Sequence, residues 1–363
     1  MDQVVILGDK CTSHLKHMFQ ENSWNKVFLV TGKKSYLNCG AKNLIAKCLP
    51  QDAAVIRFSE FENNPNIKDL RQGLKAVSEF KPSVIISIGG GSVIDMGKLI
   101  RFYYANESKI LSANCVPGKF KIPLVVLPTT AGTGSEATHF AVLYDEQKTK
   151  HSIANNAILA DYVYIYPEFT NYQSQYLTAC SGFDALSQAI EAYWNKNATK
   201  ESDIFALKAI DLIYSTLPDI LKHPTSDLRL KMAEGAYWSG KAINITKTTA
   251  PHAFSYPLTS LYGIPHGHAV AIVFAAIAAF NFASNTIPEH KLTRLRDLLK
   301  ISESVRDTFK NYINSIGLSV PENEYKYDEL VTGVNLERLS NNPASINIEE
   351  AKQLYIESLR NKC

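Results

Sequence analysis

The chain has 363 residues, of which 45% are hydrophobic and 20% are charged, and its formal net charge is +3. This composition is ordinary for a globular protein, and the length suffices for two domains with separate cores. The small charge and the lack of a long basic run argue against a nucleic-acid partner. No apolar stretch reaches the roughly 18 residues that a membrane span needs, so we expect no membrane partner either.

The N-terminus and the cysteines indicate the cellular compartment. Residues 1–8 have no basic segment and no long apolar core, so they predict a first strand instead of a signal peptide. None of the six cysteines forms a CxxC pair, which argues against a disulfide framework or a structural zinc site. We therefore expect reduced, mostly buried thiols in a cytoplasmic protein.

Residues 1–170 alternate between β-rich runs and helical segments. The predicted strands after the first are Lys26–Thr31, Ala54–Phe58, Val84–Ile88 and Pro123–Leu127. Helices are predicted between them, up to about residue 48, over residues 67–80 and from residue 92 onwards. This alternation indicates βαβ units and a mostly parallel sheet.

Residues 171–363 have a helical pattern. Apolar residues recur with helical period in five segments, namely 184–194, 204–217, 228–241, 268–280 and 302–316. The sequence therefore predicts an α/β domain over residues 1–170 and an all-α domain over residues 171–363.

Two glycine-bearing loops follow predicted strands of the first domain. Gly89-Gly90-Gly91-Ser92 joins a strand to a helix, where glycines admit a phosphate and the helix N-terminus attracts it. The segment 128–136 follows the next strand and is rich in Thr, Ser and Gly. Two such loops at neighbouring strand ends favour a dinucleotide site. Ile94 stands where a GxGxxG motif needs its third glycine, so a plain strand–helix turn remains the alternative.

Four side chains of the second domain have the chemistry of a metal site. Asp184 and Gln188 are four residues apart, so both share one helix face. His252 and His266 follow downstream, each beside a proline. A carboxylate, an amide oxygen and two imidazoles can bind a divalent cation and leave one position open. The alternative is that the histidines are structural.

Four motifs together carry a family resemblance. They are GGGSVIDMGK (89–98), PTTAGTGSEAT (128–138), DALSQAIEAY (184–193) and HAFSYPLTSLYGIPHGHAVA (252–271). With them the chain resembles the iron-containing alcohol dehydrogenase family over most of residues 1–280. The resemblance implies a dehydroquinate-synthase-like fold, in which an N-terminal dinucleotide-binding domain precedes a helical metal- and substrate-binding domain. It also implies reversible, NAD(P)H-dependent reduction of an aldehyde to a primary alcohol.

The resemblance assigns the metal ligands. They are Asp184, Gln188, His252 and His266, of which Gln188 replaces a histidine of the family. Because an amide oxygen is a harder ligand than imidazole, metal affinity should fall. We expect Fe²⁺ in preference to Zn²⁺. The alternative is that the ion is lost and Gln188 only hydrogen-bonds the substrate.

The resemblance also assigns the residues that bind the dinucleotide cofactor. They are Gly32, Asn64, Gly90, Gly91, Ser92, Asp95, Thr129, Thr130, Thr133 and Lys150. Gly32 stands where many family members have an aspartate that repels a 2′-phosphate, and Lys33 and Lys34 follow it. The sequence therefore predicts NADP(H), or use of both NADP(H) and NAD(H). The alternative is that the two lysines form a solvated helix start.

Tyr256 and His268 are the candidate catalytic residues. Tyr256 replaces a family histidine thought to relay a proton, and a tyrosine needs a lowered pKa for that task, since its ordinary pKa is about 10. His268, two residues after His266, is the substitute candidate, with a merely structural histidine as the alternative.

Lys247 is the candidate substrate-binding residue. It lies five residues before His252 and suits an anionic short aldehyde, unless it is only an exposed charge. The pattern resembles the phosphonoacetaldehyde reductase branch, which makes 2-hydroxyethylphosphonate.

Three rival functions remain open. A general short-chain alcohol or lactaldehyde dehydrogenase would act on neutral substrates. A lyase resembling dehydroquinate synthase would use NAD only transiently. A non-catalytic binding protein would have lost its metal. The resemblance also suggests a homodimer.

Overall fold

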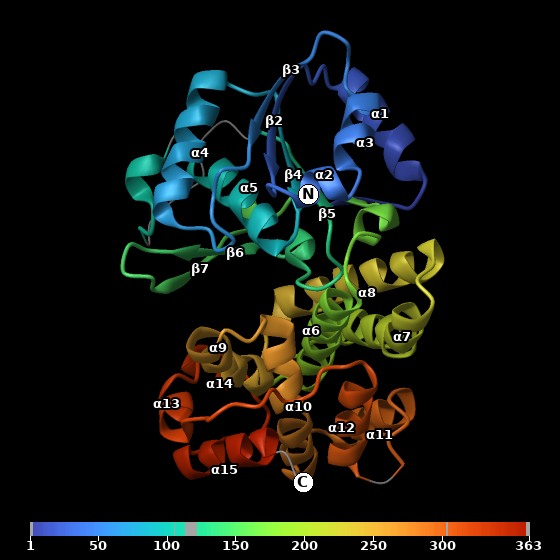
Figure 1. The fold of residues 1–363 in the computed structure, drawn as a ribbon, viewed down its shortest axis with the longest axis vertical. Coiled ribbons are helices and arrows are strands. Elements are labelled where there is room, and N and C mark those ends of the chain that lie inside the picture. The colour runs from blue at the N-terminus through green and yellow to red at the C-terminus, as the bar shows by residue number, and fades with distance from the viewer. Residues whose placement is uncertain (1–2, 105, 113–121, 303, 361–363) are drawn as a thin grey trace. The chain divides into compact units, whose positions relative to one another are not determined.

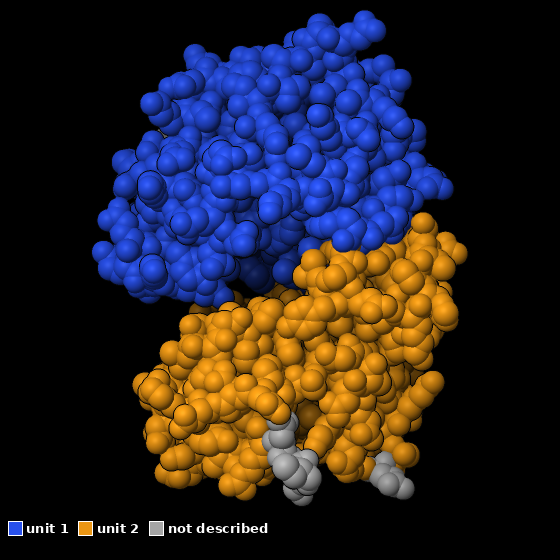
Figure 2. All heavy atoms as spheres, viewed as in Figure 1, with its two compact units in different colours: residues 1–172 blue, residues 173–363 orange. Residues whose placement is uncertain are grey.

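The computed structural model describes residues 3–104, 106–112, 122–302 and 304–360. The chain divides into two compact units, residues 1–172 and residues 173–363 (Figure 2). The first is an α/β unit and the second is helical (Figure 1). The fold class predicted from the sequence is therefore confirmed.

A six-stranded parallel sheet organises the first unit, with strand order β1-β8-β5-β4-β2-β3. Its strands are β1 Val4–Leu7, β2 Lys26–Thr31, β3 Ala54–Phe58, β4 Val84–Gly89, β5 Leu124–Pro128 and β8 Tyr162–Ile165. An antiparallel hairpin, β6 Phe140–Tyr144 with β7 Lys150–Ala154, lies outside this sheet. Because all six strands run parallel, their carboxyl ends share one edge, and the loops after β2, β4 and β5 are neighbours there.

Helices cover both faces of this sheet (Figure 1). They are α1 Lys10–Glu21, α2 Ser35–Asn38, α3 Ala41–Cys48, α4 Ile67–Phe80 and α5 Gly91–Tyr103. On one face, Leu15 and Phe19 of α1 and Ile45 of α3 pack on alternate strand residues such as Leu29 and Ile86. On the other face, α4 packs against α5. Because helices cover both faces, every residue of β4 is buried, and all of them except Ser87 and Gly89 are large apolar residues.

The second unit contains ten helices within its described residues. They are α6 Gln175–Trp194, α7 Lys200–Lys222, α8 Ser226–Thr246, α9 Ala250–Tyr262, α10 His266–Ala283, α11 Glu289–Leu298, α12 Val305–Ser315, α13 Tyr327–Thr332, α14 Leu336–Leu339 and α15 Ile348–Leu359. Helices α6, α7 and α8 pack on one another, and α10 contacts α6, α9, α12 and α15.

Helix α10 is the core helix of this unit. By length and composition it is apolar enough to cross a membrane, but 72% of that stretch is buried inside the protein. Its side chains Ile272 and Val273 pack with Phe254 of α9 and Tyr355 of α15. An apolar helix enclosed in this way is typical of a globular core.

Candidate functional site

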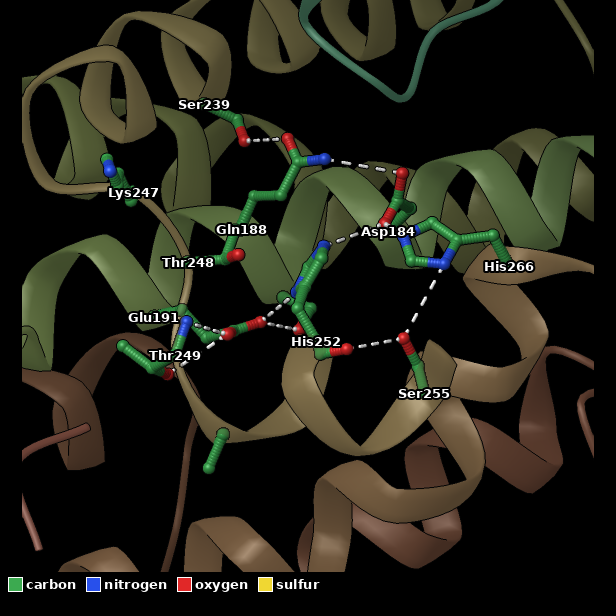
Figure 3. A network of polar contacts seen from close by, with 12 residues as sticks. Asp184, Gln188, Glu191, Ser239, Lys247, Thr248, Thr249, His252, Ser255 and His266 are labelled. Atoms are coloured by element: carbon green, nitrogen blue, oxygen red, sulfur yellow. Dashed lines mark hydrogen bonds and ion pairs between the residues drawn. The ribbon is translucent and has the colours of Figure 1, made fainter. Parts of the chain in front are cut away.

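Three helices of the second unit bring a carboxylate and two imidazoles together (Figure 3). Asp184 comes from α6, His252 from α9 and His266 from the first position of α10. One ligand atom from each lies within 4.8 Å of the other two. Asp184 Oδ1 is 3.2 Å from His252 Nε2 and 3.7 Å from His266 Nε2. The three residues have the donor atoms and the spacing of a divalent metal site.

Glu191 fixes the orientation of His252. Its carboxylate is fully buried and accepts a hydrogen bond from His252 Nδ1 at 2.5 Å. Ser187 and Thr249 also donate to this carboxylate, so its position is fixed by four hydrogen bonds in all. A proton held at Nδ1 leaves Nε2 as the ligand atom that faces Asp184.

The charges of this cluster fit a cation. Burial alone would lower the pKa of His252, but the carboxylates of Glu191 and Asp184 outweigh it and raise that pKa to about 10. Among the described residues, the buried Nε2 of His252 makes no hydrogen bond, although Asp184 Oδ1 is near. A divalent cation at this point would satisfy Nε2 and offset two buried carboxylates.

Gly267 allows His266 to reach the cluster. A Cβ atom on Gly267 would lie 2.0 Å from the backbone oxygen of Cys180 and 3.2 Å from Asp184 Cβ. Helix α10 therefore begins in direct backbone contact with α6, one residue after His266. Only glycine fits at such a contact.

Gln188 is close to the cluster, but its amide nitrogen faces it. Nε2 lies 3.3 Å from Asp184 Oδ2, and Oε1 accepts a hydrogen bond from Ser239 of α8 at 3.0 Å. That Gln188 is a metal ligand stays a prediction.

The two candidate catalytic residues differ in their surroundings. The ring of Tyr256 stacks on that of His266, with centroids 5.6 Å apart and an interplanar angle of 10°. Both ring nitrogens of His268 have partners, Tyr176 Oη at 2.9 Å and the Ser319 carbonyl at 2.8 Å. Burial lowers the pKa of His268, which suits a neutral, structurally bonded ring. Tyr256 thus contacts a residue of the cluster and His268 has the bonding of a structural histidine; that either is catalytic stays a prediction.

Lys247 forms an exposed ion pair. Its Nζ lies 2.7 Å from Glu337 Oε1, and both side chains are about half exposed. Lys247 follows α8 directly with a backbone φ of 63°. Because the ammonium has three N–H donors, an anionic substrate would either share it with Glu337 or displace Glu337.

The first unit holds the predicted cofactor residues around β4 and β5. A Cβ on Gly91 would meet Thr133 Oγ1 at 2.9 Å, and one on Gly90 would meet Thr130 at 3.5 Å. The backbone of Thr129 donates to the Gly89 carbonyl. The two predicted loops therefore pack against each other at the N-terminus of α5, and such a helix N-terminus is suited to bind a phosphate. That the loops bind the cofactor stays a prediction.

Asp95 and Lys98 connect this helix to the second loop. Asp95 accepts hydrogen bonds from Ser135 Oγ at 2.5 Å and from the backbone of Val142. Lys98 is fully buried and donates to Ser135, Thr138 and Phe140. Burial raises the pKa of Asp95, while Lys98 and, more weakly, Lys150 oppose that rise. These contacts give Asp95 a structural role in the loop pair, and that Asp95 also binds the cofactor stays a prediction.

The remaining cofactor candidates lie near other strand ends. Gly32 follows β2, and its carbonyl accepts a hydrogen bond from Arg57, whose guanidinium also reaches the carbonyl of Lys33. Lys33 pairs with Glu60 at 3.0 Å. Asn64 is exposed in the loop after β3, and Lys150 begins β7.

Sequence reasoning missed several residues that shape these sites. Glu191 lies within one motif that it quoted and Lys98 ends another, and a carboxylate or ammonium at a predicted buried position is itself a signal of pairing. Ser239 and Arg57 carry no such signal, because only the folded chain brings them to Gln188 and Gly32.

The four described cysteines Cys11, Cys39, Cys48 and Cys180 are buried free thiols, as expected. Cys115 and Cys363 lie outside the described residues.

Comparison with known proteins identifies the family. Residues 3–167 match the family model "Iron-containing alcohol dehydrogenase", and residues 178–356 match "Fe-containing alcohol dehydrogenase family, C-terminal". The 4-hydroxybutyrate dehydrogenase of Clostridium kluyveri is 31% identical over 74% of this chain and 75% of its own length. The 1-propanol dehydrogenase PduQ of Salmonella typhimurium is 31% identical over 65% of this chain and 62% of its own length.

Solved structures extend the likeness to the whole chain. The sulfoacetaldehyde reductase from Bifidobacterium kashiwanohense, in complex with NAD⁺, has a TM-score of 0.88 and 26% identity, covering 99% of this chain and 98% of its own. A 1,3-propanediol oxidoreductase has the same TM-score and identity, covering 98% and 97%. The cluster of Asp184, His252 and His266 is therefore a metal site typical of this family. The chain belongs to the iron-containing alcohol dehydrogenase family, whose enzymes are NAD(P)-dependent oxidoreductases acting on CH–OH donors.

Proposed function

We propose that this protein reduces a short aldehyde with a terminal anionic group to the corresponding primary alcohol, with NADP(H) as the favoured cofactor. The observation that carries the proposal is the cluster of Asp184, His252 and His266, of which the first two are buried and His266 is partly exposed. Two similar proteins are named for short substrates with an acidic group, 4-hydroxybutyrate and sulfoacetaldehyde. They support the anionic class, in which phosphonoacetaldehyde, giving 2-hydroxyethylphosphonate, is the member that the sequence pattern favours.

Each residue of the cluster has a separate task. Asp184, His252 and His266 would hold the cation, for which we favour Fe²⁺ over Zn²⁺. A bound cation polarises the carbonyl oxygen, and the nicotinamide supplies the hydride. Glu191 keeps the His252 proton at Nδ1. Tyr256, stacked on His266, is the candidate proton donor to the alkoxide oxygen.

The cofactor preference is proposed from charge. The loop after β2 has Gly32, Lys33 and Lys34 and no carboxylate of its own, and Arg57 adds a third cation. With Glu60 beside Lys33, this group of side chains still has a net positive charge. A 2′-phosphate is attracted to such a cluster, whereas a carboxylate would repel it. Lys247 is the candidate partner of the substrate anion. We also propose that the protein is cytoplasmic, because its described cysteines are buried free thiols. By resemblance to the family, we propose that it is a homodimer.

An aldehyde panel tests the proposal. Phosphonoacetaldehyde, sulfoacetaldehyde and 4-oxobutanoate are compared with propanal and lactaldehyde, each with NADPH and NADH and with Fe²⁺ or Zn²⁺ added. We expect a higher kcat/KM for the anionic aldehydes and for NADPH. Equal rates on neutral aldehydes would favour a general short-chain alcohol dehydrogenase. No turnover under any condition would favour the non-catalytic alternative.

A further inference from the structure

The carboxylate of Asp184 has different neighbours on its two oxygens. Oδ1 faces the imidazoles, 3.2 Å from His252 Nε2 and 3.7 Å from His266 Nε2. Oδ2 faces Gln188, whose Nε2 lies 3.3 Å away (Figure 3). A cation shared with the two imidazoles would therefore bind Oδ1, while Gln188 interacts with the other oxygen of the same carboxylate.

The far end of the Gln188 amide is also engaged. Oε1 accepts a hydrogen bond of 3.0 Å from Ser239 Oγ, and both side chains are buried. Gln188 therefore bridges Asp184, one turn earlier on α6, and Ser239 on α8 (Figure 3). The bridge ties the ligand helix to its neighbour and restricts rotation of the Asp184 carboxylate.

The carboxylate decides which way the amide is turned. A hydroxyl both donates and accepts, so Ser239 tolerates either amide orientation. Asp184 does not, since an ionised carboxylate only accepts hydrogen bonds. Because a cation shared with the imidazoles would bind Oδ1 and not lie between Oδ2 and Gln188, turning the amide over would place two oxygen acceptors 3.3 Å apart in a buried site, which is costly. The orientation with Nε2 toward Asp184 is therefore the stable one.

We propose that Gln188 is a positioning residue that holds Asp184, and that the metal centre of this protein has three protein ligands: Asp184, His252 and His266. The sequence had favoured Gln188 as a fourth ligand. The inference rests on the proposed function, because it presupposes that the cluster binds a metal. A three-ligand centre leaves more positions for water and substrate than a four-ligand centre does.

Cobalt(II) is the probe that separates the two roles. The protein is treated with a chelator, and Co²⁺ alone is titrated into the wild type and into Gln188→Met. Because the visible spectrum of Co²⁺ reports its ligands and geometry, loss of a ligand changes the spectrum, whereas loss of a positioning contact weakens affinity. Gln175→Met is the matched control, since it makes the same substitution at an exposed position of α6.

The positioning role makes a defined prediction. Gln188→Met should bind Co²⁺ about 10- to 100-fold more weakly, as expected for loss of a contact behind a ligand, with wild-type band positions and intensities at saturation. Gln175→Met should match the wild type in both. Gln188→Asn, which keeps an amide on a shorter side chain, repeats the comparison if the methionine variant does not fold.

The contrary results are distinguishable. A changed spectrum in a Gln188 variant that still binds Co²⁺ would make Gln188 a ligand and overturn this inference alone. Unchanged affinity in the variant would also overturn it, because Asp184 would then need no support. Failure of the wild type to bind Co²⁺, or equal binding by Asp184→Asn, would overturn the proposed metal centre and this inference together.

Discussion

Substituting Gly267 by alanine tests whether the contact between α6 and α10 builds the metal centre. The new Cβ would lie 2.0 Å from the Cys180 oxygen and 2.7 Å from the Cys180 carbonyl carbon, and real Cβ contacts essentially never fall below 3.0 Å. The obstacle is backbone, so no rotamer change relieves it. The start of α10 must therefore move from α6 by about 1 Å, and His266 must move with it.

The size of this displacement sets the expected effect. Metal–ligand distances are held to within about 0.2 Å, so a shift of about 1 Å between His266 and Asp184 breaks the site. We expect metal affinity to fall at least 100-fold. Overpacking should also cost about 1–3 kcal/mol of unfolding free energy, although alanine gains up to about 1 kcal/mol over glycine in helix propensity.

Gly182→Ala on α6 is the control for this substitution. Its Cβ would meet only the ends of the Leu217 and Met232 side chains, which can move. Both variants are assayed by chelator competition for Zn²⁺ and by urea unfolding. Wild-type metal affinity in Gly267→Ala would refute the argument, as would equal metal losses in the two variants.

Four further predictions follow from single contacts. Glu191→Gln should weaken metal binding about 10- to 100-fold in chelator competition, because His252 loses its charged acceptor; wild-type affinity would contradict the orienting role. Lys98→Met should lower the unfolding free energy, measured by urea unfolding, by about 3–5 kcal/mol, because it leaves the buried acceptors of the Lys98 ammonium unsatisfied. A loss below about 1 kcal/mol would contradict this bonding role of Lys98. Burial raises the pKa of Glu136 from its ordinary value of 4.5 to about 7. The folded state therefore keeps a proton that the unfolded chain loses, so wild-type stability should fall between about pH 5 and pH 7, and less steeply in Glu136→Gln; equal slopes in urea titrations would refute this. Lys247→Ala should raise KM for anionic aldehydes only. Its unfolding free energy should change little, because an exposed ion pair contributes at most about 1 kcal/mol. An equal rise in KM for propanal would reject the substrate-binding role of Lys247.

The regular elements were largely predictable because each has a local cause. The strand Ala54–Phe58 and the helix Ile67–Phe80 have the predicted bounds, since turn residues flank the first and Asn66 caps the second. The order of the sheet was not predictable, because it depends on pairing between strands far apart in the chain, such as β1 with β8. The hairpin of β6 and β7 was also missed.

The site was predictable only as far as motifs reach. Asp184, His252 and His266 were found from the family pattern, and the structure brings them together. The residues that hold the site together were not found. Glu191 is 61 residues from His252 in the sequence, and Ser239 is 51 residues from Gln188. Such contacts depend on how helices pack, which residue spacing does not specify.

Gln188 in place of the family histidine removes one ligand but leaves the charge of the centre the same, because a neutral imidazole and an amide both carry no charge. Two buried carboxylates, Asp184 and Glu191, still face two imidazoles within one cluster. Buried carboxylates need a cation or many donors nearby. Glu191 has its donors, whereas Asp184 Oδ1 points at the ring nitrogens. The electrostatic demand for a cation therefore lies at Asp184 Oδ1 and does not depend on residue 188, which is why we expect metal binding to persist in this chain.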